Sequence, residues 1–171
     1  LVGAALLLAA CDTPEERVEK HYRRGVEHLE NDDERRAWVE FRNAVEIDEN
    51  HAPSRFEIAQ LFEGDGELRA AVGNYRLVAD LDPAHLESRL RLARIMMAAG
   101  EIDEARRYAE AAGEIAPDDP ETIAARAAVL YRAGETEVAL EEARRAIEIE
   151  PLHIGANLVV IADLTAAGRL E

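Results

Sequence analysis

A fixed spacing of 34 residues governs most of this chain. Proline recurs at that spacing in Pro83, Pro117 and Pro151. Glycine and alanine follow the same period, at Gly66, Gly100, Gly134 and Gly168 and at Ala37, Ala71, Ala105 and Ala139. Self-similarity at a fixed period of this length is typical of proteins in which one structural unit is stacked on the next.

Each unit contains two apolar-periodic segments separated by short turns, as the stretch 86–119 shows most plainly. Glycine at a helix end accepts a left-handed backbone, and proline cannot continue a helix interior. Alanine where two helices cross lets their axes approach to about 8–10 Å. We therefore predict an all-α fold, an α-solenoid of antiparallel helix pairs with four full repeats and a partial fifth. The predicted units are 18–51, 52–85, 86–119, 120–153 and the partial unit 154–171.

The pattern resembles the tetratricopeptide repeat over residues 18–171. The small residue of that motif in the first helix is matched by Gly25, Ala59, Ala93 and Ala127. The place four residues after the first alanine of the second helix is held by Phe41, Tyr75, Ala109 and Ala143. The resemblance implies a scaffold for protein–protein interaction, in which the first helices of successive units line a concave groove.

Carried over place by place, the resemblance assigns a peptide-binding groove to eight residues. They are Tyr22, Val26, Phe56, Gln60, Leu90, Arg94, Met97 and Tyr131. Ala124 and Ala128 would lie in the same groove, with Arg91 and Arg132 near its edge. This mixture of aromatic, arginine and small residues suits an extended peptide or a partner helix. The alternative interpretation is that Phe56, Leu90 and Met97 only fill gaps between units.

The chain is strongly acidic, with 36 acidic and 20 basic residues. Binding to nucleic acid or to an anionic bilayer needs clustered Lys and Arg, so this balance argues against both. Partners are therefore expected to be proteins or peptides, and contact with a membrane only through a lipid anchor.

The beginning of the chain has a pattern of its own. Residues 1–10 are uncharged and almost wholly apolar, and the single cysteine, Cys11, stands where the polar sequence begins. Ten residues are too few to span a bilayer as a helix, which needs about 20. The junction resembles the lipobox of bacterial lipoproteins. It implies a signal segment at 1–10, lipidation of Cys11 and a short linker over 11–17; the alternative is a buried Cys11 in a short helix.

Candidate catalytic and metal-binding residues have structural interpretations. His51, His85 and His153 occupy the last place of their units, with Asp119 in the third unit, which indicates a turn or helix-capping role. These side chains would lie about one repeat apart, too far to share a metal. There is no glycine-rich phosphate loop, and no nucleophile lies beside a base. The sequence therefore predicts a non-catalytic protein without a metal or cofactor.

The two ends of the predicted solenoid differ. His21, Arg24 and His28 place polar groups on the first helix, as expected of a terminal capping unit. The last helix is apolar, with Ile154, Leu158, Val159, Val160, Ile161 and Leu164. We expect that face to be covered by further repeats beyond residue 171 or by a second copy of the chain.

Together these features predict a lipid-anchored tetratricopeptide-repeat lipoprotein of the bacterial cell envelope, facing the periplasm. Its expected role is to hold another protein during assembly or export of envelope or surface polymers. Two alternatives stay open: a soluble cytoplasmic adaptor, and the repeat domain of a longer protein whose activity lies beyond residue 171. The sequence alone does not identify the bound protein, the oligomeric state, or the inner or outer membrane.

Overall fold

The structure is a computed structural model that describes residues 12–168. Within this range it contains nine α-helices and no strand, which confirms the predicted all-α solenoid. The helices are α1 (Pro14–Glu30), α2 (Glu34–Ile47), α3 (Ala52–Gly64), α4 (Leu68–Leu81), α5 (Leu86–Ala99), α6 (Ile102–Ile115), α7 (Pro120–Arg132), α8 (Thr136–Ile149) and α9 (Ile154–Ala166). The predicted signal segment 1–10 and Cys11 lie outside the described residues.

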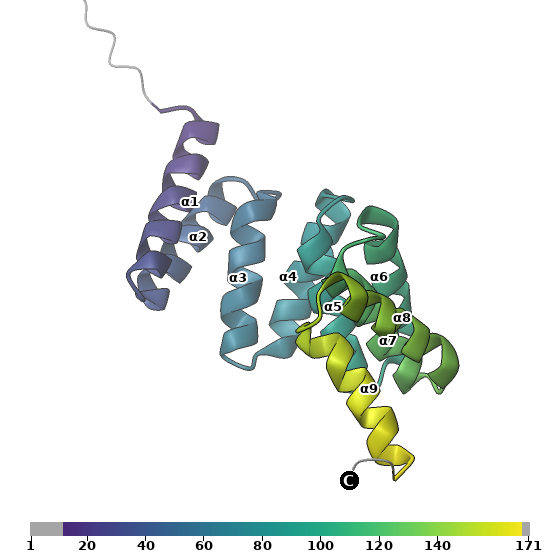
Figure 1. The fold of residues 1–171 in the computed structure, drawn as a ribbon. Helices are drawn as coiled ribbons and strands as arrows, with labels where there is room; N and C mark the ends of the chain where they lie inside the picture. The colour runs from purple at the N-terminus through teal and green to yellow at the C-terminus, as the bar shows by residue number, and fades with distance from the viewer. Residues whose placement is uncertain (1–11, 169–171) are drawn as a thin grey trace, which may run out of the picture.

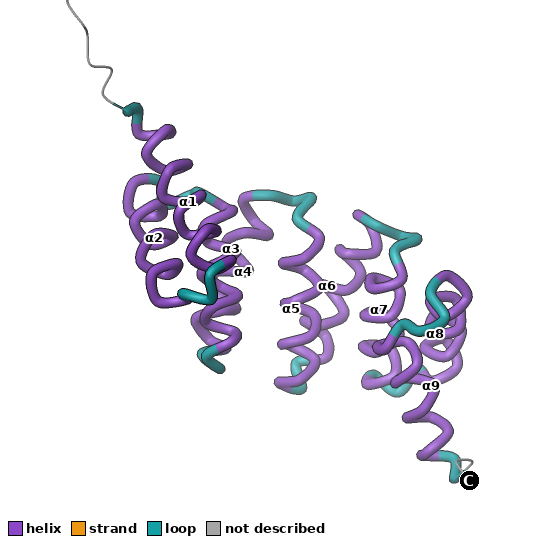
Figure 2. Tube along the Cα trace, turned by 60° about the vertical axis from the view of Figure 1, so that its left-hand side comes forward, coloured by secondary structure: helices purple, strands orange, loops and turns teal. Residues whose placement is uncertain are grey.

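Odd-numbered helices are the first helices of the units, and even-numbered helices are the second. Each helix contacts the next one along the chain, and the helix pairs follow one another in a row (Figures 1 and 2). The first helices of neighbouring units also contact each other, most closely α5 with α7 and α7 with α9. Helices this short are marginal in isolation, so each depends on burying its apolar face against its neighbours.

Small side chains allow the close packing of the two helices within a unit. The alanine that recurs near the start of each second helix, at Ala37, Ala71, Ala105 and Ala139, has no exposed surface. In the first unit the opposing position is Gly25, where an added Cβ would lie 2.4 Å from the ring of Phe41. The ring of Phe41 therefore occupies the space that a side chain at position 25 would need.

The turn inside each unit uses a left-handed residue. Gly66, Gly100, Gly134 and Gly168 have φ angles between 66° and 85°, and Asp32 takes the same place in the first unit with φ 56°. Glycine adopts this conformation without a steric penalty, and aspartate is one of the few other residues that tolerate it. The turn therefore explains the periodic glycines.

The junctions between units are capped by side chains, as the histidine pattern predicts. Nδ1 of His51, His85 and His153 accepts a hydrogen bond from the backbone N–H three residues on, at 3.2–3.3 Å. Asp119 accepts the equivalent bond from Thr122 at 2.8 Å. Each cap satisfies one of the N–H groups that a helix start leaves without a partner.

The first helix begins earlier than the predicted unit boundary. α1 starts at Pro14 rather than Val18, so residues 14–17, which the sequence interpretation places in a linker over 11–17, are helical. The reason is a capping box: Thr13 accepts from the backbone of Glu16, and the Glu16 side chain accepts from the backbone N–H of Thr13. Proline also favours the first helical position.

The two outer helices have the faces that their sequences suggest. On α1, Arg24 is exposed, and His21 lies against Glu40 of α2 at 2.6 Å. On α9, Ile154, Leu158 and Ile161 form one stripe and are 76%, 57% and 46% exposed. No helix within residues 12–168 has the length and apolar character needed to cross a membrane.

Candidate functional site

A groove of about 560 Å³ runs across the first helices α5, α7 and α9. The helices contribute equivalent positions, because residues 34 apart occupy the same place in successive units. From α5 come Glu87, Leu90, Arg91, Ala93, Arg94 and Met97; from α7, Glu121, Ala124, Ala125, Ala128, Val129, Tyr131 and Arg132; from α9 and its cap, His153, Gly155, Leu158, Val159 and Ala162.

The floor of the groove is apolar and formed largely by small residues. Ala124 and Ala128 of α7 lie where α3 carries Phe56 and Gln60 and where α5 carries Leu90 and Arg94. Ala124 is buried and Ala128 is half-buried, so neither fills the space above the helix. The hollow thus arises from the loss of side-chain bulk at two places on α7.

The rims of the groove are polar. Arg94 and Met97 of α5 and Tyr131 and Arg132 of α7 lie toward the C-terminal ends of their helices. Glu87 and Glu121 lie at the second position of the same two helices. An apolar floor between polar rims with an aromatic residue, a methionine and arginines is the composition that energetically important protein interfaces favour.

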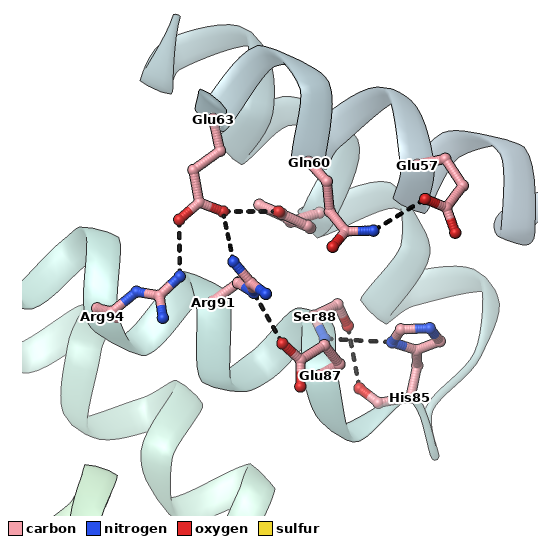
Figure 3. A network of polar contacts seen from close by, with 9 residues as sticks. Glu57, Gln60, Glu63, His85, Glu87, Ser88, Arg91 and Arg94 are labelled. Carbon is pink, nitrogen blue, oxygen red and sulfur yellow. Dashed lines mark hydrogen bonds and ion pairs between the residues drawn. The ribbon is translucent and has the colours of Figure 1, made fainter. Parts of the chain in front are cut away.

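A network of ion pairs fixes one rim of the groove to the preceding unit (Figure 3). Glu63 of α3 accepts from Arg94 at 2.7 Å and from Arg91 at 3.4 Å, both on α5. Arg91 also donates to Glu87 at 2.7 Å. The buried Tyr75 of α4 donates its hydroxyl hydrogen to Glu63 at 2.7 Å. One carboxylate therefore joins three helices.

The surroundings of this network shift the pKa of Glu63 and the pKa of Tyr75 in opposite directions. Burial would raise the pKa of Glu63, but the hydrogen bonds from Tyr75 and Arg94 and the charges of the two arginines outweigh burial and lower it. Burial and the adjacent Glu63 carboxylate raise the pKa of Tyr75 far above its usual range. Glu63 is thus ionised and Tyr75 protonated at neutral pH, and the charges of the rim are fixed.

The predicted groove residues fall into two groups. Leu90, Arg94, Met97 and Tyr131 line the groove, together with Ala124, Ala128, Arg91 and Arg132. The other four lie in the first two units, outside it. In these two units an aromatic residue of the first helix packs on the histidine that caps the first helix of the following unit. Tyr22 of α1 lies 5.5 Å from His51, and Phe56 of α3 lies 4.7 Å from His85, ring centre to ring centre.

Val26 and Gln60 complete this second group. Val26 packs against the buried cluster of Ala37, Phe41 and Ile58. Gln60 donates to Glu57 at 3.0 Å and borders a separate hollow of about 300 Å³. Four of the eight predicted groove residues thus line the groove across α5, α7 and α9, and four lie outside it.

The sequence interpretation did not assign the contribution of α9 to the groove. Leu158 and Val159 were expected to belong to an uncovered end, yet they line the groove beside α7. The signal was present, since Leu158 is 34 residues beyond Ala124 and 68 beyond Leu90. Glu87, Glu121 and Ala162 were also left unassigned.

The described residues form no cluster of side chains that could hold a metal ion. Between residues 12 and 168 no group of three or more His, Cys, Asp or Glu side chains is placed to hold a metal ion. The histidines nearest the groove are engaged in capping, and Nε2 of His153 lies 3.0 Å from Glu121.

Comparison with known proteins identifies the type of fold. Residues 62–129 match the family model described as tetratricopeptide repeat. No curated protein sequence matches the chain. MamA from Desulfovibrio magneticus RS-1 is similar in structure, with a TM-score of 0.78 and 14% identity over 90% of this chain and 86% of that one.

Two further solved structures are also similar. YrrB, described as a TPR protein with an unusual peptide-binding site, has a TM-score of 0.75 and 14% identity over 93% of this chain and 86% of that one. The pilF protein of Pseudomonas aeruginosa has a TM-score of 0.73 and 19% identity over 91% of this chain and 71% of that one. The chain thus has the fold of tetratricopeptide-repeat solenoids.

Proposed function

We propose that this chain is a non-catalytic tetratricopeptide-repeat scaffold that holds a polypeptide partner in the groove across α5, α7 and α9. The observation that carries the proposal is the alanine floor of α7 between polar rims. Repeat solenoids present extended inner surfaces of this kind to partners. The description of YrrB as a TPR protein with a peptide-binding site supports the same role here.

The composition of the groove favours a partner with apolar side chains. Filling the space above Ala124 and Ala128 with a leucine or phenylalanine side chain contributes about 1.5–3 kcal/mol. Met97 adapts its shape readily, and Tyr131 offers a large rigid surface at low entropic cost. The polar rims then select the side chains that flank the buried ones.

The groove is also held rigid before a partner binds. Glu63 fixes Arg94 and Arg91, so the α5 wall is tied to α3 and α4. Preorganisation of a binding surface lowers the entropic cost of association. A rigid groove of this kind suits a scaffold that holds its partner without reshaping.

Selection of peptides from a random display library tests the proposal. Peptides are selected on the full chain and then measured against Ala128→Trp, which fills the floor. Ala84→Trp, at an exposed turn outside the groove, is the matched control. We expect Ala128→Trp to weaken binding at least about tenfold and Ala84→Trp to leave it unchanged. Equal binding to both variants, with unchanged thermal melts, would overturn the proposal.

We also propose that the scaffold is anchored by lipid at Cys11, in the bacterial envelope and facing the periplasm, where it acts in assembly or export of envelope or surface polymers. The support is the apolar segment 1–10 that ends in Ala9, Ala10 and the single cysteine. Incorporation of radiolabelled palmitate that is lost in Cys11→Ala is the expected result. Recovery of an unlabelled chain in the soluble cytoplasmic fraction would favour the adaptor instead.

A further inference from the structure

We infer that the partner in this groove is an amphipathic α-helix with one acidic and one basic flank, lying across α5, α7 and α9. The inference rests on the proposed function and adds the conformation and charge of the partner. It is carried by the order of charges and small residues along the helices that form the groove.

The two rims of the groove carry opposite charges. Along α7 the order is Glu121, then Ala124, Ala125 and Ala128, then Arg132. Along α5 the order also runs from acidic to basic, with Glu87, then Leu90 and Arg91, then Arg94. Glu87 and Glu121 are equivalent positions, 34 residues apart, and form one rim. Arg94 lies at the place of Ala128 and Arg132 about one turn further along its helix, and these two arginines form the other rim, toward the C-terminal ends of α5 and α7.

The separation of the rims fits a helix. Glu87 and Arg94 are seven residues apart and Glu121 and Arg132 eleven, which at about 1.5 Å per residue gives about 10 and 16 Å along the helix axes. An α-helix with its side chains is about 10–12 Å across.

The charges at the ends of α7 are the most available to a partner. Arg132 is exposed, and among residues 12–168 it has no carboxylate within ion-pair distance. The side chain of Glu121 is 61% exposed, although one oxygen lies near His153. An acidic group of the partner is therefore expected at Arg132 and a basic group at Glu121, with the apolar stripe over the alanines between them.

The rim charges on α5, Glu87 and Arg94, are partly neutralised by other side chains of the protein. They therefore contribute less to partner binding than the charges on α7. Arg94 donates to Glu63 at 2.7 Å and Glu87 accepts from Arg91 at 2.7 Å. Both side chains remain about half exposed, so each keeps surface for a second partner. On the other side of α7, Leu158 of α9 extends the apolar floor and is 57% exposed.

Three synthetic helical peptides with the same leucine stripe provide the test. One has a glutamate flank and a lysine flank, the second has glutamate on both flanks, and the third has lysine on both. Exposed charge pairs are individually weak, so summed over the rims we expect the mixed peptide to bind about tenfold more tightly than either other peptide. The difference should shrink at high salt.

Charge reversal on the protein then assigns each rim. Glu87→Lys combined with Glu121→Lys should move the preference to the peptide with two glutamate flanks. Arg132→Glu should move it toward the peptide with two lysine flanks. Glu137→Lys, at the second position of α8, and Arg144→Glu, exposed on α8, are the matched controls and should leave the preference unchanged. Melting curves of all variants confirm that they fold.

The outcomes separate this inference from the proposed function. Equal affinity for the three peptides, lost in Ala128→Trp, would overturn the charge order and leave the proposed function standing. So would display-selected peptides that bind in the groove without gaining helical circular dichroism, because the partner would then be extended. Failure of every helical and every selected peptide to bind would overturn both.

Discussion

At the residue scale, two glycines in helix interiors have opposite surroundings. Gly25 of α1 faces the ring of Phe41, whereas nothing lies within 4 Å of a Cβ built on Gly73 of α4. Alanine is favoured over glycine in a helix interior by about 1 kcal/mol. The local space therefore decides whether the substitution helps or harms.

Gly25→Ala is expected to destabilise the chain by about 1–3 kcal/mol, because the added methyl group overpacks the α1–α2 contact. Gly73→Ala is expected to stabilise it by about 0.5–1 kcal/mol. Urea unfolding of the two variants measures both effects. Stabilisation by Gly25→Ala would show that Phe41 moves aside freely and that the close crossing is not required.

The histidine cap at His51 makes stability depend on pH. Burial lowers the pKa of His51, against the opposing effect of Asp48 and Glu19, below its ordinary value of 6.5. The folded state then binds fewer protons than the unfolded state. The contribution is fully present above pH 6.5 and is lost as the pH falls from there through the folded pKa.

His51→Asn keeps an acceptor at this cap and removes the titration. We expect the free energy of unfolding of the variant to fall less than that of the unchanged chain between neutral and mildly acidic pH. Denaturant unfolding at a series of pH values measures the slope of the free energy of unfolding against pH for the variant and for the unchanged chain. Identical slopes would mean that His51 has the same pKa in the folded and unfolded chain.

At the scale of helices, the Tyr75–Glu63 contact joins α3 and α4 of the second unit, and Glu63 in turn contacts Arg94 on α5 of the third unit. Tyr75→Phe removes a hydrogen bond to a charged group, which contributes about 1.5–3 kcal/mol. Tyr108→Phe is the control, since the Tyr108 hydroxyl accepts a hydrogen bond from Arg76 at the surface, at 3.3 Å, and its loss should change stability by less than about 0.5 kcal/mol. Equal losses in thermal or urea unfolding would show that the buried contact has no special weight.

Also at this scale, the sequence predicted the helix pairs well. The helix crossing needs a small residue such as Ala105, and the turn needs a residue with a left-handed backbone such as Gly100. Because these residue types recur every 34 residues, the sequence alone predicts where the crossings and turns lie. The start of α1 was missed because its capping box at Thr13 lies before the first repeat unit. This capping signal stands outside the 34-residue period that defines the predicted unit boundaries.

At the scale of the whole molecule, the 34-residue period does not predict which units line the groove. Equivalent places differ in side-chain bulk, so Phe56 packs onto His85 while Ala124 leaves space. The contact between Glu63 and Arg94 spans 31 residues and depends on how neighbouring units are placed. The space above Ala124 and the Glu63–Arg94 contact depend on how one unit stacks on the next. The sequence pattern of a single unit does not specify that stacking.

The central claim is that the inner face of α5, α7 and α9 receives the partner. Amide chemical-shift mapping by NMR, during titration with a peptide selected on the full chain, tests it most directly. We predict perturbations centred on Leu90, Met97, Ala128, Tyr131 and Leu158. Perturbations centred on the second helices α4, α6 and α8, with these five residues unaffected, would contradict the account.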